Sequence, residues 1–230
     1  MATNLDLQEQ EQLDSLKAFW KSYGNLITWT LILALGAFAG WRYWQHRQAQ
    51  QGLEAGAMYE ELDRAATAGD LQKVGRVMAD LQQRFPKTVF AAQGALLAGK
   101  VQAEKGQPDA AKASLGWVVS TVDDADLKAM ARLRLAAVHA EAKSFDEATK
   151  LLAEPVPAAY EALRADRQGD VLVLQGKAPE AVAAYQRAHA AMSDKVDYRR
   201  FVEAKLAALG SPVGVAAAAA ASAPATGASK

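Results

Sequence analysis

The sequence predicts an all-α protein in which one N-terminal transmembrane helix precedes a superhelix of helical hairpins. Residues 22–41 are apolar and uncharged, and helix-favouring segments alternate with short turns from about residue 53 onward. The composition is rich in alanine and poor in aromatic residues outside the apolar stretch. Alanine has the highest helix propensity, whereas aromatic and β-branched residues favour strands. These observations favour tightly packed helices over sheet.

The apolar stretch has the length and the ends of a membrane-spanning helix. Its 20 residues lie between Lys21 and Arg42, and at about 1.5 Å rise per residue they extend about 30 Å, the thickness of the bilayer hydrocarbon. Trp and Tyr rings favour the headgroup level. The rings at the two ends are therefore predicted interface anchors: Trp20, Tyr23, Trp41, Tyr43 and Trp44.

Two other interpretations of this stretch are a cleaved signal peptide and a buried globular helix. The small residues Ala37 and Ala39 have the spacing that a signal peptidase reads, but residues 1–21 are long and acidic, whereas signal peptides begin with a basic segment. A buried globular helix rarely carries aromatic rings at both ends. We therefore predict an uncleaved anchor, in which Gly36 and Gly40 form a small-xxx-small motif suited to packing against another helix.

Charge alone leaves the orientation of this anchor open. Lys17 and Lys21 precede the span, while Arg42 and Arg47 follow it, so the count of basic residues is equal on the two sides. The residues that follow, 42–52, are predicted to form a juxtamembrane stalk.

Composition excludes several classes of function. Acidic and basic residues both number 26, and without a basic excess or polybasic stripe a nucleic-acid partner is not expected. The absence of cysteine excludes disulfides, thiolate zinc sites and cysteine nucleophiles. Residues 210–230 are rich in Ala, Pro, Gly and Ser, and this composition predicts a disordered tail.

A period is visible in residues 53–209. Turn residues occur at Gly69, Gly106, Lys143 and Gly176, with spacings of 37, 37 and 33 residues. Nine residues after each turn residue lies a bulky apolar side chain, and seven residues before the last three lies a small one: Gly99, Ala136 and Gly169. Small residues let two helices approach closely while the bulky residue fills the space beside them.

Helix starts carry recognisable signals. Ser144 and Glu147 have the spacing of a capping box. The acidic cluster around Asp124 is suited to capping the helix that follows. Pro108 and Pro179 lie where a first-turn proline is tolerated.

The pattern resembles the tetratricopeptide repeat (TPR), a helix-turn-helix unit of roughly 34 residues that stacks into a superhelix. Pro86 falls where that repeat usually ends. The alternative is a generic Ala-rich helical bundle, because no unit has the early Trp of the family and two spacings are longer. A final helix over residues 198–209 is expected to cover the open end of the stack.

No catalytic, metal or cofactor site is apparent, so the protein is not expected to be an enzyme. His46, His139 and His189 have no second histidine three or four residues away, and there is no glycine-rich phosphate loop or nucleophile elbow. Binding through the concave face is expected instead. The residues predicted to line that face, unless they merely pack between repeats, are Leu96, Lys100, Leu133, Ala137, Asp166 and Asp170.

The whole arrangement resembles the bacterial ancillary subunit of the SecYEG translocon over roughly residues 10–209. The resemblance lies in the order of an acidic N-terminus, one anchor and a degenerate repeat domain, and in the following motifs: Gly40-Trp41-Arg42-Tyr43-Trp44, Leu127-Lys128-Ala129, Leu133-Arg134-Leu135-Ala136 and Asp166-Arg167-Gln168-Gly169-Asp170.

The resemblance implies a location and a set of partners. It implies a single-pass inner-membrane protein with a cytoplasmic N-terminus and a periplasmic repeat domain. The implied partners are the translocon, a membrane-anchored periplasmic prolyl-isomerase-like chaperone and secreted polypeptide clients, and no catalytic residues are implied. A membrane-tethered TPR scaffold for envelope assembly or stress signalling is the alternative function.

Overall fold

The structure, a computed structural model, describes residues 7–193 and 196–212, with side chains from residue 11 onward. Within these ranges the chain is helical and contains no strand, as predicted. Residues 1–6 and most of the predicted tail, residues 213–230, lie outside the described residues. The elements are α1 (Leu7–Ala68), α2 (Leu71–Arg84), α3 (Val89–Glu104), α4 (Pro108–Thr121), α5 (Ala125–Glu141), α6 (Phe145–Ala153), η1 (Ala158–Tyr160), α7 (Glu161–Leu174), α8 (Ala178–Ala191) and α9 (Tyr198–Ala208).

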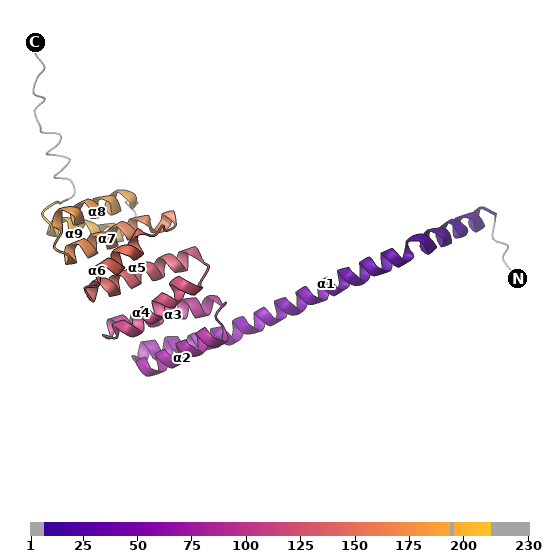
Figure 1. Ribbon diagram of the computed structural model, residues 1–230, viewed down its shortest axis with the longest axis horizontal. Helices are drawn as coiled ribbons and strands as arrows, with labels where there is room; N and C mark the ends of the chain where they lie inside the picture. Colours follow the sequence, from indigo (N-terminus) through magenta and orange to yellow (C-terminus); the bar gives the residue numbers. More distant parts are fainter. Residues whose placement is uncertain (1–6, 194–195, 213–230) are drawn as a thin grey trace, which may run out of the picture. The chain divides into compact units, whose positions relative to one another are not determined.

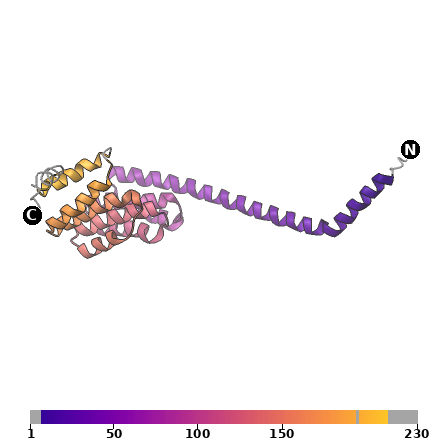
Figure 2. The same ribbon diagram turned by 90° about the horizontal axis from the view of Figure 1, so that it is seen from above.

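The helix α1 contains the predicted membrane span. It runs without interruption through residues 22–41 and 42–52, and the chain divides into two compact units between Glu54 and Ala55. Among the described residues it is the one helix long and apolar enough to cross a membrane, and only 6% of its most apolar window is buried. A core helix of this chain would instead be mostly covered. Figure 2 shows the length of α1 and a bend in its indigo, amino-terminal part.

The four predicted turns share one backbone geometry. Gly69, Gly106, Lys143 and Gly176 have φ values of 72°, 74°, 60° and 76°. After each, the next N–H bonds to a carbonyl five residues earlier, as in Gln107 to Gln102 at 2.8 Å. This left-handed turn closes a helix, and glycine adopts it without a Cβ penalty. A fifth turn of the same kind, at Gly210 with φ 75°, closes α9.

These turns divide the repeat domain into four helical hairpins, each of which is one repeat unit. The first helix of each unit is the end of α1, α3, α5 or α7, and the second is α2, α4, α6 or α8 (Figure 1). Each helix from α2 onward packs against the next, and α3, α5 and α7 also contact one another in order. We call the surface formed by these first helices the inner face.

Close contact between the two helices of a unit is confirmed at the predicted positions. A Cβ added at Gly99 would lie 2.5 Å from Cγ of Leu115, and one at Gly169 would overlap the ring of Tyr185. Ala136 and Leu152 share one buried cluster in the third unit. The small residues therefore permit an approach that a larger side chain would prevent.

The helix starts confirm one predicted cap and correct another. The carboxylate of Asp124 accepts from the N–H groups of Asp126 and Leu127, at 3.0 and 2.9 Å. The predicted capping box at Ser144 is wrong, because this N-cap residue makes no side-chain capping bond. Its own N–H, which Glu147 would have to bind, already donates to the carbonyl of His139 in the left-handed turn.

The last helix is held by a buried acid. Asp166 of α7 is 1% exposed, and its carboxylate accepts from Oη of Tyr198 at 2.8 Å and Nζ of Lys205 at 2.7 Å, both in α9. Asp170 accepts from the same Nζ and, at 2.8 Å, from Oη of Tyr185. A buried carboxylate is costly unless it is paired and hydrogen-bonded. Removal of α9 would leave Asp166 without these partners.

The two tyrosines of this network ionise with difficulty. Burial and the hydrogen bond to Asp166 raise the pKa of Tyr198 to about 12. Burial and the hydrogen bond to Asp170 also raise the pKa of Tyr185. An ionised phenolate would lose the proton that it donates and would face a carboxylate of the same charge.

We expect opposite effects from the same substitution at two glycines. Gly99→Ala should lower the free energy of unfolding by about 1–2 kcal/mol because the new methyl group overlaps Leu115. Gly116→Ala, in α4 where an added Cβ meets nothing within 4 Å, should raise it by about 0.5–1 kcal/mol. Urea unfolding of the full chain in detergent, followed by circular dichroism, measures both. Equal shifts in one direction would contradict the close-contact account.

Alkaline conditions should release α9. Because the pKa of Tyr198 rises from 10.0 to about 12 on folding, its stabilising contribution is complete below pH 10 and is lost as the pH rises toward 12. Thermal unfolding between about pH 9 and 11.5 should show a smaller fall for Tyr198→Phe than for the unchanged chain. Tyr59→Phe, which is outside the network, serves as control and should keep the original fall. An identical fall in all three proteins would contradict the assignment.

Candidate functional site

The structure places the six predicted inner-face residues in two groups. Leu96, Leu133 and Asp166 are buried, with exposed fractions of 4%, 8% and 1%. The side chain of Lys100 is exposed, with Nζ 3.9 Å from Glu104, while Ala137 and Asp170 are partly buried. Of the six, Lys100 alone is exposed.

A pocket of about 400 Å³ lies on the inner face between α5, η1, α7 and α9. We call it the inner pocket. Met130, Leu133 and Leu163 make its lining largely apolar. The remaining lining residues are the rings Tyr160 and Tyr198 and the charged residues Arg134, Asp166 and Arg167. The inner pocket thus includes two of the predicted residues, Leu133 and Asp166, and does not include the other four.

The charged side chains around the inner pocket differ in whether they are paired with a side chain of opposite charge. Asp166 is paired with Lys205, and Arg167 donates to Asp170 at 2.9 Å. Arg134 donates to the carbonyl of Leu96 at 3.0 Å, a neutral acceptor rather than a carboxylate. The pocket can accept an apolar side chain and has a cation at its edge for an oxygen acceptor.

Sequence reasoning missed the aromatic part of this pocket. Tyr160 comes from η1, between the third and fourth units, and Tyr198 from α9, beyond the last unit. Neither position belongs to the repeating helix-turn-helix pattern. Arg134 could have been predicted from the sequence, because it directly follows Leu133, which was predicted to line the inner face.

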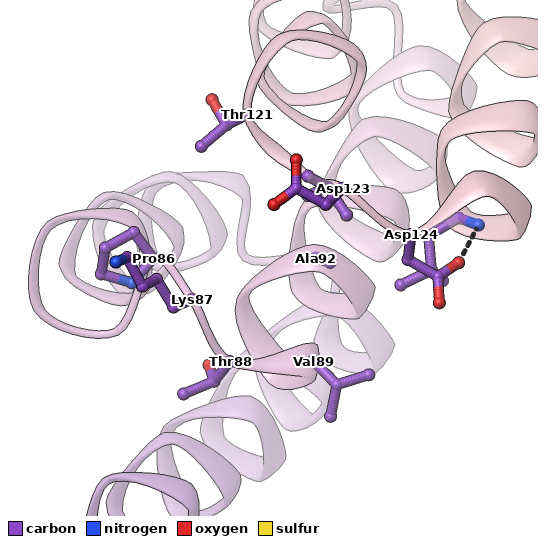
Figure 3. Close-up of a pocket in the computed structure, with 10 residues that line it drawn as sticks. Pro86, Lys87, Thr88, Val89, Ala92, Thr121, Asp123 and Asp124 are labelled. Atoms are coloured by element: carbon purple, nitrogen blue, oxygen red, sulfur yellow. Dashed lines mark hydrogen bonds between the residues drawn. The ribbon is translucent and has the colours of Figure 1, made fainter. Parts of the chain in front are cut away.

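A larger pocket of about 650 Å³ lies between the loops that precede α3 and α5. Figure 3 shows Pro86, Lys87 and Thr88 on one side and Thr121, Asp123 and Asp124 on the other. Two of its polar groups already cap helices: Thr88 accepts from the N–H of Ala91, and Asp124 accepts in α5. We interpret it as the junction between adjacent repeats.

Metal chemistry finds no support in the part of the chain that the structure describes, where no group of three His, Asp or Glu side chains could hold an ion. His189 lies 2.9 Å from Glu203 and accepts from Arg199. Burial lowers the pKa of His139. These two histidines therefore lie on different helices, α5 and α8.

The predicted anchor residues lie on an open helix surface. Trp20, Tyr23, Trp41, Tyr43 and Trp44 are all exposed. A Cβ added at Gly36 or Gly40 would meet nothing within 4 Å. The face that bears these two glycines is thus available for close contact with another helix.

The similarity to known proteins extends over both the apolar helix and the repeat domain. Residues 17–211 match the sequence model of the tetratricopeptide repeat-like domain. A relative from Neisseria gonorrhoeae named "Ancillary SecYEG translocon subunit" is 32% identical over 88% of this chain and 98% of its own length. Proteins of the same name from Haemophilus influenzae and Escherichia coli are 30% and 28% identical, covering 79% and 77% of this chain and 89% and 85% of theirs.

No solved structure matches the chain. The shared name describes an accessory part of a translocon rather than a reaction, in agreement with the prediction that the protein is not an enzyme. The TPR-like interpretation of the repeats is confirmed over the matched residues, and the apolar part of α1 indicates a membrane anchor. The chain belongs to the tetratricopeptide repeat-like domain family and, within it, to the ancillary SecYEG translocon subunits.

Proposed function

We propose that this protein is a non-catalytic adaptor of the SecYEG translocon in the bacterial inner membrane. Residues 22–41 span the membrane once, with residues 1–21 cytoplasmic and the repeat domain periplasmic. The observation that carries the proposal is the similarity to relatives named as translocon subunits, which extends over most of this chain and most of theirs.

The anchor is the proposed contact with the translocon. Gly36 and Gly40 lie one turn apart on α1 with open space around them. Small residues at this spacing let a neighbouring helix approach closely within a bilayer. Trp20, Tyr23, Trp41, Tyr43 and Trp44 hold the ends of the span at the two interfaces.

The inner face is the proposed contact with soluble partners. These are a membrane-anchored periplasmic prolyl-isomerase-like chaperone, emerging secreted polypeptides, or both. The inner pocket supports this, because its apolar lining and the cation of Arg134 suit an apolar side chain on an extended backbone. Exposed Lys100 of α3 and partly buried Ala137 of α5 and Asp170 of α7 lie on the first helices of three successive units and are further proposed contacts.

Site-specific photo-crosslinking tests the location and the partners. A photoreactive residue at Gly36 or Gly40 should form adducts with translocon subunits, and one at Lys100 should form adducts with secreted chains or a periplasmic chaperone. Adducts between Lys100 and cytosolic proteins alone would reverse the orientation and overturn the proposal. Adducts with envelope-assembly or stress-signalling proteins, without translocon subunits, would favour the tethered scaffold instead.

A charge placed in the inner pocket should weaken client binding. Met130→Glu puts a carboxylate among apolar side chains, and we expect the Lys100 adducts to fall by about tenfold because that charge must be desolvated on binding. Ala183→Glu adds the same charge at an exposed position of α8 and should leave the adducts unchanged. Equal adduct yields from both variants would show that the inner pocket is not the binding site.

A further inference from the structure

The part of α1 that precedes the membrane span has two unlike faces. We call residues 11–21 the pre-span segment. At about 100° per residue, its large apolar side chains fall within one arc of about 120°. All of them are exposed, at 42%, 62%, 50% and 60%: Leu13, Leu16, Phe19 and Trp20.

The opposite face of the pre-span segment is charged. Glu11, Asp14, Lys17 and Lys21 are exposed and lie away from the apolar arc. Lys17 and Asp14 form an ion pair at 3.2 Å in which both side chains remain about three-quarters exposed. This face is suited to water, whereas the apolar face requires a cover.

The membrane surface is the apolar environment closest, along the chain, to the apolar face of the pre-span segment. The pre-span segment leads directly into the span at residue 22. If α1 crossed the bilayer upright and straight, these 11 residues would project about 16 Å beyond the hydrocarbon and leave Leu13 and Leu16 in water. Lying in the plane of the interface would bury them.

The helix has the features that such a change of direction requires. α1 bends in its indigo, amino-terminal part (Figure 2). At the start of the span, Oγ1 of Thr28 donates to the carbonyl of Gly24 at 2.7 Å, and the indole of Trp20 lies against Gly24, where an added Cβ would be 3.2 Å from the ring. Glycine together with a hydroxyl bonded to the backbone is a common cause of helix bending.

We propose that the pre-span segment is an interfacial amphipathic helix that binds the phospholipid surface on which the span begins. Leu13, Leu16 and Phe19 enter the boundary between headgroups and acyl chains, and the charged face remains in water. Continuity with the membrane-spanning residues identifies lipid as the partner. The proposal goes beyond the adaptor function and does not depend on which side of the membrane the N-terminus occupies.

The absence of cysteine allows a direct test in the full chain. Leu16→Cys and Ser15→Cys place a single thiol on neighbouring residues, one in the apolar arc and one outside it. Each purified protein is reconstituted alone into nanodiscs of phosphatidylethanolamine and phosphatidylglycerol, which expose both membrane surfaces. A charged maleimide should then label residue 16 at least about tenfold more slowly than residue 15.

A second readout separates lipid burial from simple steric protection. A spin label at residue 16 should collide with dissolved oxygen, which concentrates in lipid, and be protected from a water-soluble nickel chelate; a label at residue 15 should behave in the opposite way. Phe19→Cys repeats the apolar measurement should Leu16→Cys lose helicity.

Two results would overturn the proposal. Equal labelling of residues 15 and 16 would mean that the segment stands in water. Protection of residue 16 that appears only when translocon is added would assign the apolar face to a protein groove. Because the chain is tested alone in lipid, failure here is distinct from failure of the adaptor function.

Discussion

The repeat domain depends on how closely the two helices of each unit approach one another. At Gly99 and Gly169 the facing side chain occupies the space that a Cβ would need. The bulky partners Leu115 and Tyr185 are themselves buried, at 1% and 3% exposed. A wider separation would open voids along the hairpin and change how α3, α5 and α7 stack. The shape of the inner face therefore depends on buried residues between the helices, such as Gly99 and Leu115, that are not part of its surface.

The fourth unit links this packing to electrostatics. Tyr185 covers Gly169 with its ring and donates its hydroxyl proton to Asp170. Asp170 shares Lys205 with Asp166, and Asp166 in turn orients Tyr198 at the edge of the inner pocket. A single chain of contacts thus runs from a helix-helix contact to the wall of the inner pocket. The end of the stack thus combines these charged contacts with an apolar cluster that includes Tyr185, Val202 and Leu206.

The sequence was sufficient for the fold because the fold is repetitive and local. Glycine turns, first-turn prolines and the small-to-bulky spacing each act within one hairpin. Gly69, Gly106 and Gly176 lie in turns as expected, and the structure shows that these turns are left-handed. Lys143 takes the same conformation without being glycine, and the turn spacing alone located it. The capping box failed because it competed with that turn for one N–H.

The candidate site was predicted less completely because it depends on contacts between distant residues. Asp166 looked like an accessible acid on a first helix, yet its partner Lys205 lies 39 residues away and buries it. Tyr160 and Tyr198 belong to no repeat position, so no period could point to them. Leu96 and Leu133 are both buried, which periodicity does not give, and of the two Leu133 lines the inner pocket.

The left-handed turn at Gly210 bears on how such an array ends. It follows Gly176 by 34 residues, so α9 finishes as the first helix of a unit would finish. Seven residues before the turn, where the second, third and fourth units have Gly99, Ala136 and Gly169, α9 has Glu203, whose carboxylate lies 2.9 Å from Nε2 of His189. A second helix packed there at the usual distance would meet a charged side chain. Glu203 therefore gives α9 a charged surface at the position where these three units have a small residue.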